Sequence, residues 1–230
     1  MQTQKCPHCS ANNVICKGQR KKKYSTSQIY YCKNCQRKFT DALLKNKKYT
    51  ASAITAAINT YNLGNTLEQT ALRINKQYKT KTSKSTIHTW LKEYREITDC
   101  TKVRKEIIKT GKQPIIARRF EHNGLAYNFK YHDIKLQQCG HPNLISYIQK
   151  FRNGCPPFFN SIQNRCSQLK IQIHINKHEE ENNLCKLAML AAKACTANKE
   201  RHPCIENFAL INDEHTIACE LPIWLWEKNI

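Results

Sequence analysis

The chain has 230 residues and a formal net charge of +21, from 38 Lys and Arg against 17 Asp and Glu. Its apolar fraction of 40% and charged fraction of 24% are typical of globular proteins, which excludes a wholly disordered chain. No apolar run approaches the roughly 20 residues of a membrane helix, and the start, MQTQKCPHCS, lacks the apolar segment of a secretory signal. We therefore expect a cytoplasmic protein that neither spans a membrane nor is secreted.

The positive charge is concentrated in the first part of the chain. Residues 1–100 contain 19 Lys and Arg and 5 Asp and Glu, whereas residues 101–230 contain 19 and 12. Such a field attracts polyanions, and nucleic acid is the commonest large polyanion in a cytosol. We expect a nucleic-acid partner and an association with a prokaryotic-type nucleoid. A generally basic proteome or a device for solubility is the alternative explanation of the charge.

Two Cys-x-x-Cys pairs lie near the amino terminus: Cys6 with Cys9, and Cys32 with Cys35, with 22 residues between the pairs. A chain without an export signal rarely keeps disulfides, so pairs at this spacing favour metal ligation. Each pair forms a tight turn, and a hairpin between them brings four thiolates around one ion. The pattern predicts a structural Zn²⁺ site, and an iron site with the same four ligands is the alternative.

These features predict a zinc ribbon over residues 1–44. Asn12–Lys17 and Gln28–Tyr31 have the pattern of the two hairpin strands, and zinc would replace the hydrophobic core that about 40 residues cannot build. His8 and Cys16 are expected not to be ligands. A basic cluster near the hairpin turn is expected to contact DNA: Arg20, Lys21, Lys22 and Lys23.

Residues 45–98 carry three helical patterns. Thr50 is the expected cap of the first helix, which Gly64 terminates; the sequence from Thr66 to Gln69 is a capping box for the second, and Ser83 caps the third. Each helix has an apolar stripe: Ala53, Ile54, Ala57, Ile58 and Tyr61; Leu67, Ala71, Ile74 and Tyr78; Ile87, Trp90, Leu91 and Tyr94. Three short helices in a basic region predict a helix-turn-helix domain.

The third helix is the expected DNA-recognition helix. Its stripe leaves five side chains outward, from where they can reach base edges: Lys84, Ser85, His88, Thr89 and Lys92. Three lysines in the preceding segment suit phosphate contacts: Lys76, Lys79 and Lys81. The alternative is an ordinary three-helix bundle with a solvated charged face.

The segments CPHC…CKNCQRKFT and YNLGNTLEQTALRINKQYKTKTSKSTIHTWLKEY resemble the amino-terminal region of prokaryotic insertion-sequence transposases. The resemblance covers about residues 1–96 and implies a zinc ribbon before a helix-turn-helix that recognises the ends of a mobile element. The carboxylate triad that such transposases carry on a ribonuclease-H-like fold is not evident after residue 100. We expect a zinc-dependent protein of mobile-element or DNA-processing type that binds double-stranded DNA.

Residues 99–230 are predicted to form an α+β domain, so the whole chain is expected to be an α+β multidomain protein. Eight further cysteines in this part show no Cys-x-x-Cys spacing, and most of them are expected to be small buried apolar residues. The expected elements are a helix over Pro142–Phe151, a strand over Leu169–Ile175, a helix over Glu179–Ala197, and a hairpin of Asn207–Ile211 and Thr216–Trp226.

Glu220 is a carboxylate inside this last apolar strand. If it is buried it must be paired, shift its pKa or bind a cation, and an exposed face or a salt bridge is the alternative. The segment RHPCIENFALINDEHTIACELPIWLWEKNI resembles the start of a RecB-like PD-(D/E)XK nuclease core. This resemblance implies that Glu206 and Glu220 are catalytic carboxylates that hold Mg²⁺.

In that family the next strands supply an Asp and a D/E-x-K triplet, which would fall after Ile230. The D-x-K triplet Asp133–Lys135 precedes Glu220 and is left unassigned. Taken at face value the nuclease core is incomplete, as in a truncated or frameshifted copy or one part of a split protein. The expected protein partners are a second copy in a homo-oligomer, or a partner chain that completes the C-terminal domain. The alternative functions are a Mg²⁺-dependent DNA nuclease and an RNA-binding or transcription-associated zinc ribbon.

Overall fold

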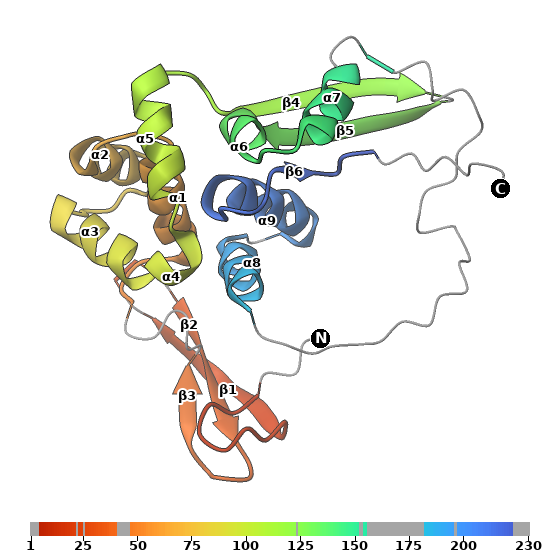
Figure 1. Ribbon diagram of the computed structural model, residues 1–230. Helices are drawn as coiled ribbons and strands as arrows, with labels where there is room; N and C mark the ends of the chain where they lie inside the picture. Colours follow the sequence, from red (N-terminus) through yellow and green to blue (C-terminus); the bar gives the residue numbers. More distant parts are fainter. Residues whose placement is uncertain are drawn as a thin grey trace. The chain divides into compact units, whose positions relative to one another are not determined.

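The computed structural model describes residues 5–21, 23–24, 26–40, 47–122, 124–151, 154–155, 182–195 and 197–222 (Figure 1). These residues form an α+β structure with two small antiparallel sheets and helices α1 to α9, as the sequence predicts. Among the residues so described, none of the helices has the length and apolar character needed to cross a membrane. The chain divides into two compact units: Met1–Tyr61, Asn65–Glu93 and Ala188–Ile205 in the first, and Asn62–Gly64, Tyr94–Leu187 and Glu206–Ile230 in the second.

The first unit begins with a three-stranded antiparallel sheet in the order β1-β2-β3, formed by Val14–Lys21, Thr26–Cys32 and Lys38–Thr40 (Figure 1). The predicted hairpin is therefore confirmed, and its strands are longer than expected. Buried Cys6, Cys32 and Phe39 form its small core. Two of these three residues are cysteines, so little hydrophobic stabilisation is available without a metal.

A β-bulge interrupts the pairing of β1 with β2 between Cys16 and Gln19. Gly18 lies within it at φ 101°, a conformation that glycine adopts without strain. The side chain of Gln28 on β2 fixes the bulge, because its Nε2 donates a hydrogen bond to the Gly18 carbonyl at 2.7 Å.

Three helices follow in the first unit: α1 (Ala51–Asn62), α2 (Leu67–Tyr78) and α3 (Lys84–Glu93). All three predicted caps are present. Thr50 Oγ1 accepts from the Ala53 N–H at 3.2 Å, and Ser83 Oγ accepts from the Thr86 N–H at 3.3 Å. The capping box of α2 is complete in both directions. The most deeply buried residues of the stripes are Ala53, Ile54, Ala57 and Ile58 on α1, Ala71 and Ile74 on α2, and Ile87 and Trp90 on α3.

Two later helices, α8 (Asn183–Ala194) and α9 (Asn198–Asn212), were expected only in part. The predicted helix over Glu179–Ala197 is confirmed over Asn183–Ala194, and residues 179–181 and 196 lie outside the described part. Cys195 and Cys204 form a disulfide that joins the end of α8 to α9, whereas most of the later cysteines had been expected to be buried thiols. Cys155 and Cys185 also depart from this expectation, because they are exposed.

The second unit contains the antiparallel sheet β4-β5-β6, formed by Ile115–His122, Leu125–His132 and Ala218–Cys219. Helices α6 (Asp133–Gln138) and α7 (Pro142–Lys150) lie over this sheet (Figure 1). An aromatic cluster of Phe120, Phe129, Tyr131 and Phe151 forms its core. Helices α4 (Arg95–Thr98) and α5 (Thr101–Thr110) precede the sheet.

The turn after α1 packs closely against α5. Gly64 has φ 99°, and a Cβ atom at this position would lie 3.2 Å from the Ile107 side chain. The predicted helix stop is therefore also a place where the backbone closely approaches the Ile107 side chain of α5.

In the second unit one predicted element is wrong, one is described only in part and one lies wholly outside the described residues. Residues 207–211 are helical and belong to α9, so the predicted strand there is wrong; a short apolar run has no periodicity that separates a strand from a buried helix. The second predicted strand is observed at Ala218–Cys219, and residues 223–230 lie outside the described part. The strand expected over Leu169–Ile175 also lies outside it. The helix over Pro142–Phe151 is confirmed as α7.

Candidate metal centre and nucleic-acid interface

The sulfur atoms of Cys6, Cys9, Cys32 and Cys35 converge, and all lie within 4.8 Å of one another. Cys6 Sγ is 3.6 Å from Cys35 Sγ, and Cys9 Sγ is 3.6 Å from Cys32 Sγ. A tetrahedral zinc site with Zn–S bonds of about 2.3 Å requires sulfur–sulfur separations of about 3.8 Å. The four residues therefore fit a Cys₄ zinc ion and are too far apart to be two disulfides.

The two cysteine pairs have equivalent backbones. The residue after each second cysteine adopts a left-handed conformation, with φ 57° at Ser10 and φ 56° at Gln36. The Ser10 N–H donates to the Cys6 carbonyl at 2.8 Å, which closes the first turn. The Cys32 N–H donates to the Arg37 carbonyl at 3.0 Å, which closes the second. Each pair is thus held as a tight turn by its own backbone.

The four thiols influence one another's ionisation. The Cys35 N–H lowers the pKa of Cys32 to about 7. The Ala11 N–H favours the Cys9 thiolate, but desolvation and hydrogen bonds with the other three thiols outweigh it and raise the pKa of Cys9 to about 12. Four adjacent thiolates repel one another, so a bound cation is needed for all four to be ionised together.

His8 and Cys16, which were predicted not to be ligands, lie outside the sulfur cluster. The His8 ring packs edge-on against Phe39, with ring centroids 6.4 Å apart. Cys16 is exposed on β1.

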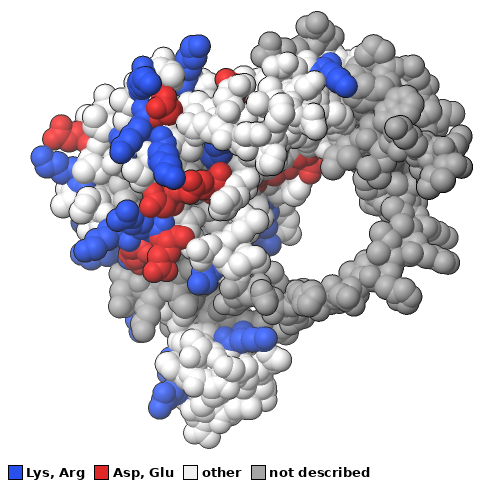
Figure 2. Space-filling view, viewed as in Figure 1, with Lys and Arg blue, Asp and Glu red and all other residues white. Residues whose placement is uncertain are grey.

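All of the predicted DNA-contacting side chains that the structure describes are exposed. They are Lys76, Lys79 and Lys81 in and after α2, Lys84, Ser85, His88, Thr89 and Lys92 on α3, and Arg20, Lys21 and Lys23 near the ribbon turn. Lys22 lies outside the described residues. Over α2 and α3 the basic side chains are interleaved with acidic ones (Figure 2). One such pair is Lys84 with Glu68, at 3.2 Å.

The turn between α2 and α3 is organised by Asn75, a residue that the sequence analysis did not select. Its Oδ1 accepts hydrogen bonds from the Thr82 N–H at 2.6 Å, the Thr82 hydroxyl at 2.7 Å and the Thr80 hydroxyl at 3.0 Å. Its Nδ2 donates to the Thr82 carbonyl at 2.9 Å. Asparagine is unfavourable within helices because its side chain competes for backbone groups, so its presence late in α2 before two threonines was the available sequence signal.

An aromatic chain joins the ribbon turn to α3 within the first unit. The rings of Tyr24 and Tyr49 stack with centroids 5.0 Å apart, and Tyr49 meets Trp90 edge-on at 5.0 Å. The Tyr49 hydroxyl donates to the Lys81 carbonyl at 3.2 Å, and Lys47 forms an ion pair with Glu93 at the end of α3. The segment before α1 is thus anchored to both ends of the α3 region.

The second unit brings Glu206 and Glu220 together, with carboxylate oxygens within 4.8 Å of each other. Glu206 is half-buried on α9, as the resemblance to a nuclease core implies for a helix carboxylate. Glu220 is exposed and follows β6 with φ 57°, so it is not a buried strand carboxylate. The exposed alternative for Glu220 is the one observed.

Lys135, the lysine of the unassigned D-x-K triplet, is buried and has a structural role. Its Nζ donates to the carbonyls of Leu210 and Asp213 at 2.6 Å each and to that of Thr216 at 3.3 Å. These carbonyls lie at and beyond the carboxyl end of α9, where a cation is favoured. Burial lowers the pKa of Lys135, but all three ammonium protons have acceptors.

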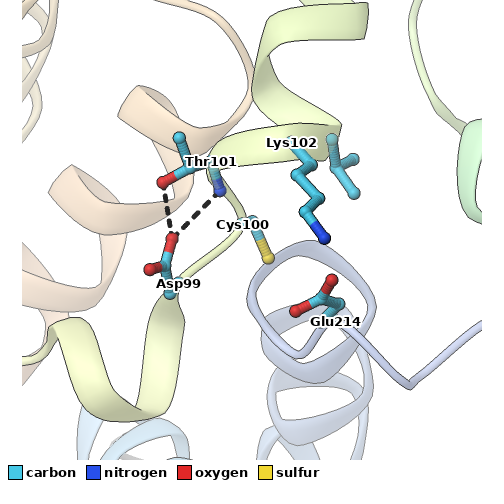
Figure 3. A pocket seen from close by; sticks show the side chains of 6 residues that line it. Asp99, Cys100, Thr101, Lys102 and Glu214 are labelled. Atoms are coloured by element: carbon cyan, nitrogen blue, oxygen red, sulfur yellow. Dashed lines mark hydrogen bonds between the residues drawn. The ribbon is translucent and has the colours of Figure 1, made fainter.

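A small hollow of about 120 Å³ lies at the start of α5, lined by Cys100, Lys102 and Glu214 among others (Figure 3). At its edge, Asp99 accepts from the Thr101 hydroxyl at 2.5 Å and from the Thr101 N–H at 3.1 Å, and these hydrogen bonds lower the pKa of Asp99. Burial raises the pKa of Cys100 to about 11, so the thiol is protonated near neutral pH. The Cys100 thiol in this hollow is therefore not an activated nucleophile, and the polar contacts of Asp99 serve the start of α5.

No protein-family model, curated protein or solved structure matches this chain. Its function must therefore be inferred from the residues themselves.

Proposed function

We propose that this chain is a zinc-dependent protein of mobile-element or DNA-processing type that binds double-stranded DNA. In this proposal α2 and α3 are a helix-turn-helix, and α3 enters the major groove. The observation that carries the proposal is the combination, on α3, of a buried apolar side with an exposed side on which Lys84, Ser85, His88, Thr89 and Lys92 precede a single carboxylate, Glu93, that is ion-paired with Lys47.

The two sides of α3 suit different partners. Ile87 and Trp90 are buried, which fixes the helix on the first unit. The opposite side exposes the five residues from Lys84 to Lys92 named above. A helix with side chains is about 10–12 Å across, and the major groove of B-DNA is about 12 Å wide. Lysine, serine, threonine and histidine side chains at this surface can donate to base-edge acceptors or to phosphates.

The neighbouring lysines supply the electrostatic part of binding. Lys76, Lys79 and Lys81 are exposed on α2 and the turn, next to the amino end of α3. Each lysine that neutralises a phosphate releases condensed counterions, so affinity is expected to fall steeply with salt. The Cys₄ centre supports the same function by ordering a second basic element, the ribbon, in the same unit.

Binding to a mixed-sequence duplex, measured by fluorescence anisotropy at several salt concentrations, tests the proposal. We expect the logarithm of the affinity to fall with the logarithm of salt by about 0.9 for each phosphate neutralised. The double variant Lys84→Ala/Lys92→Ala should lower affinity, whereas Lys105→Ala, an exposed lysine of α5, should have little effect. Affinity that is flat between about 50 and 200 mM salt, or equal for both variants, would overturn the proposal.

A second candidate function is a Mg²⁺-dependent DNA nuclease, which the proximity of Glu206 and Glu220 favours. Two carboxylates at this separation can share a hard divalent cation. Lys135 does not serve as the catalytic lysine in this candidate, because three backbone carbonyls already bind its ammonium group. A plasmid-nicking assay with Mg²⁺ distinguishes the candidates: cleavage that is lost in Glu220→Gln supports a nuclease, and the absence of cleavage leaves DNA binding alone.

A further inference from the structure

The ribbon sheet has an open face on the side opposite its cysteine core. Strand register places Ile15 of β1 and Lys38 of β3 directly beside Tyr31 of β2, and directly paired residues share a face. Lys17 lies in the β-bulge, where the alternation of faces is interrupted, and it belongs to the same face because its ammonium group lies over the Tyr31 ring. We call Ile15, Lys17, Tyr31 and Lys38 the outer face. On the opposite side, Tyr30 and Phe39 pack with the cysteines.

Tyr31 lies at the centre of the outer face, with a lysine on each side. Lys17 Nζ is 4.7 Å from the centroid of the Tyr31 ring, and Lys38 is its cross-strand partner on β3. Both lysines are exposed and Tyr31 is half-buried. Ile15, beside Tyr31 on the same face, is 41% exposed, so accessible apolar surface adjoins the ring. The outer face is thus an aromatic surface flanked by two cations.

No acidic residue between Lys5 and Thr40 balances this charge. Between Lys5 and Thr40 the sequence has no Asp or Glu, and the ribbon shows blue and no red side chains at the foot of the view in Figure 2. The same segment has nine basic residues: Lys5, Lys17, Arg20, Lys21, Lys22, Lys23, Lys33, Arg37 and Lys38. The partner that complements this surface is an anion with accessible aromatic or apolar groups.

We propose that the outer face binds single-stranded DNA, with one base stacked on Tyr31 and the adjoining phosphates beside Lys17 and Lys38. This is a second nucleic-acid site, separate from the α3 surface of the proposed function. Bases stack on aromatic side chains whatever their sequence, and lysines along the strand neutralise its backbone. Lys17 leaves the ring when the base arrives, and its ammonium group exchanges a cation–π contact for a phosphate contact.

The width of the sheet argues for a single strand rather than a duplex. Strands are about 4.8 Å apart, so β1 and β3 are separated by about 10 Å before side chains are counted. The major groove admits a helix or a two-stranded ribbon, and the outer face is one strand wider than such a ribbon. In a duplex the faces of the bases are also covered by their neighbours, whereas a single strand can present one to Tyr31.

Binding affinity for labelled oligothymidylate, measured by fluorescence anisotropy, tests this site. The zinc-loaded full-length chain is used, and oligothymidylate is chosen because it cannot pair with itself. Tyr31→Ala should weaken binding by roughly 5- to 150-fold, and Tyr31→Phe, which keeps the ring, should bind close to wild type. Lys17→Ala and Lys38→Ala should each weaken binding more than Lys33→Ala, which removes an equal charge from the second cysteine turn. Retained zinc content shows that each variant ribbon is folded.

Three results with DNA would overturn the assignment, and a fourth, with RNA, would change the ligand. The first three are equal oligothymidylate affinity for Tyr31→Ala and wild type, equal losses for Lys38→Ala and Lys33→Ala, and an equal Tyr31→Ala loss on a duplex. Oligouridylate binding that is tighter than that of oligothymidylate and depends on Tyr31 would identify RNA as the ligand and overturn single-stranded DNA. The duplex measurement with Lys84→Ala/Lys92→Ala reports on the proposed function alone, so the two proposals fail separately.

Discussion

Asn75, near the end of α2, and Thr82, just before α3, are joined by three hydrogen bonds. The asparagine accepts from both the N–H and the hydroxyl of Thr82 and donates to its carbonyl. Thr82 is buried, so these groups have little access to water. One side chain therefore sets the direction in which the chain enters α3.

Replacing Asn75 with Ala should destabilise the first unit by about 2–3 kcal/mol, because it leaves buried donors and an acceptor of the turn without partners. We expect duplex affinity to fall as well, since α3 loses its fixed orientation. Denaturant unfolding and anisotropy measure the two effects. Gln77→Ala removes an exposed amide from the same helix and is the matched control. Equal stability of the two variants would show that the network does not hold the turn.

Lys135→Met should destabilise the second unit by about 2–4 kcal/mol. The methionine keeps most of the side-chain volume but removes the donors for three carbonyls at the end of α9. Thermal unfolding followed by circular dichroism measures the loss, and Lys105→Ala, an exposed lysine, should be close to wild type. A stability loss for Lys135→Met no larger than that of the control would contradict the structural role.

Because His132 is buried, we predict that the second unit loses stability at acidic pH. Burial, and then the Lys135 ammonium group, lower the pKa of His132 to about 3, and its Nδ1 accepts the Lys135 N–H at 3.3 Å. The unfolded chain has a histidine pKa of about 6.5 and binds the proton first, so stability is complete above pH 6.5 and falls toward pH 3. The slope is about 1.4 kcal/mol per pH unit.

His132→Asn isolates this contribution, because asparagine keeps a hydrogen-bond acceptor at the start of α6 but does not titrate. We expect the difference in unfolding free energy between wild type and variant to shrink as pH falls from 6.5 to 4.5. Parallel curves over this range would mean that the folded protein protonates His132 as readily as the unfolded chain.

The elements predicted correctly are those encoded by local patterns. The cysteine spacing and the caps at Thr50, Thr66 and Ser83 each act within a few residues, so the ribbon and α1–α3 could be located from sequence. The β4–β5 hairpin was missed although Asn123-Gly124, a frequent hairpin dipeptide, stands between its strands. The strand expected over 207–211 was wrong because its apolar run also suits a buried helix.

The candidate sites likewise include residues that local patterns predict and residues whose roles depend on distant contacts. Exposure of the α3 side chains follows from helical periodicity and was predicted residue by residue. The role of Lys135 had no local signal, since its acceptors lie 75 to 81 residues away. The outer face of the ribbon depends on strand register, which the sequence analysis did not assign.

Metal analysis of freshly purified protein tests the central claim most directly, because the ribbon depends on the ion held by Cys6, Cys9, Cys32 and Cys35. We predict about one zinc atom per chain, lost in Cys32→Ser and retained in Cys16→Ser, whose thiol lies outside the cluster. One iron atom in place of zinc would keep the four-cysteine centre and change only its ion. Neither metal near one atom per chain, or unchanged content in Cys32→Ser, would contradict the account.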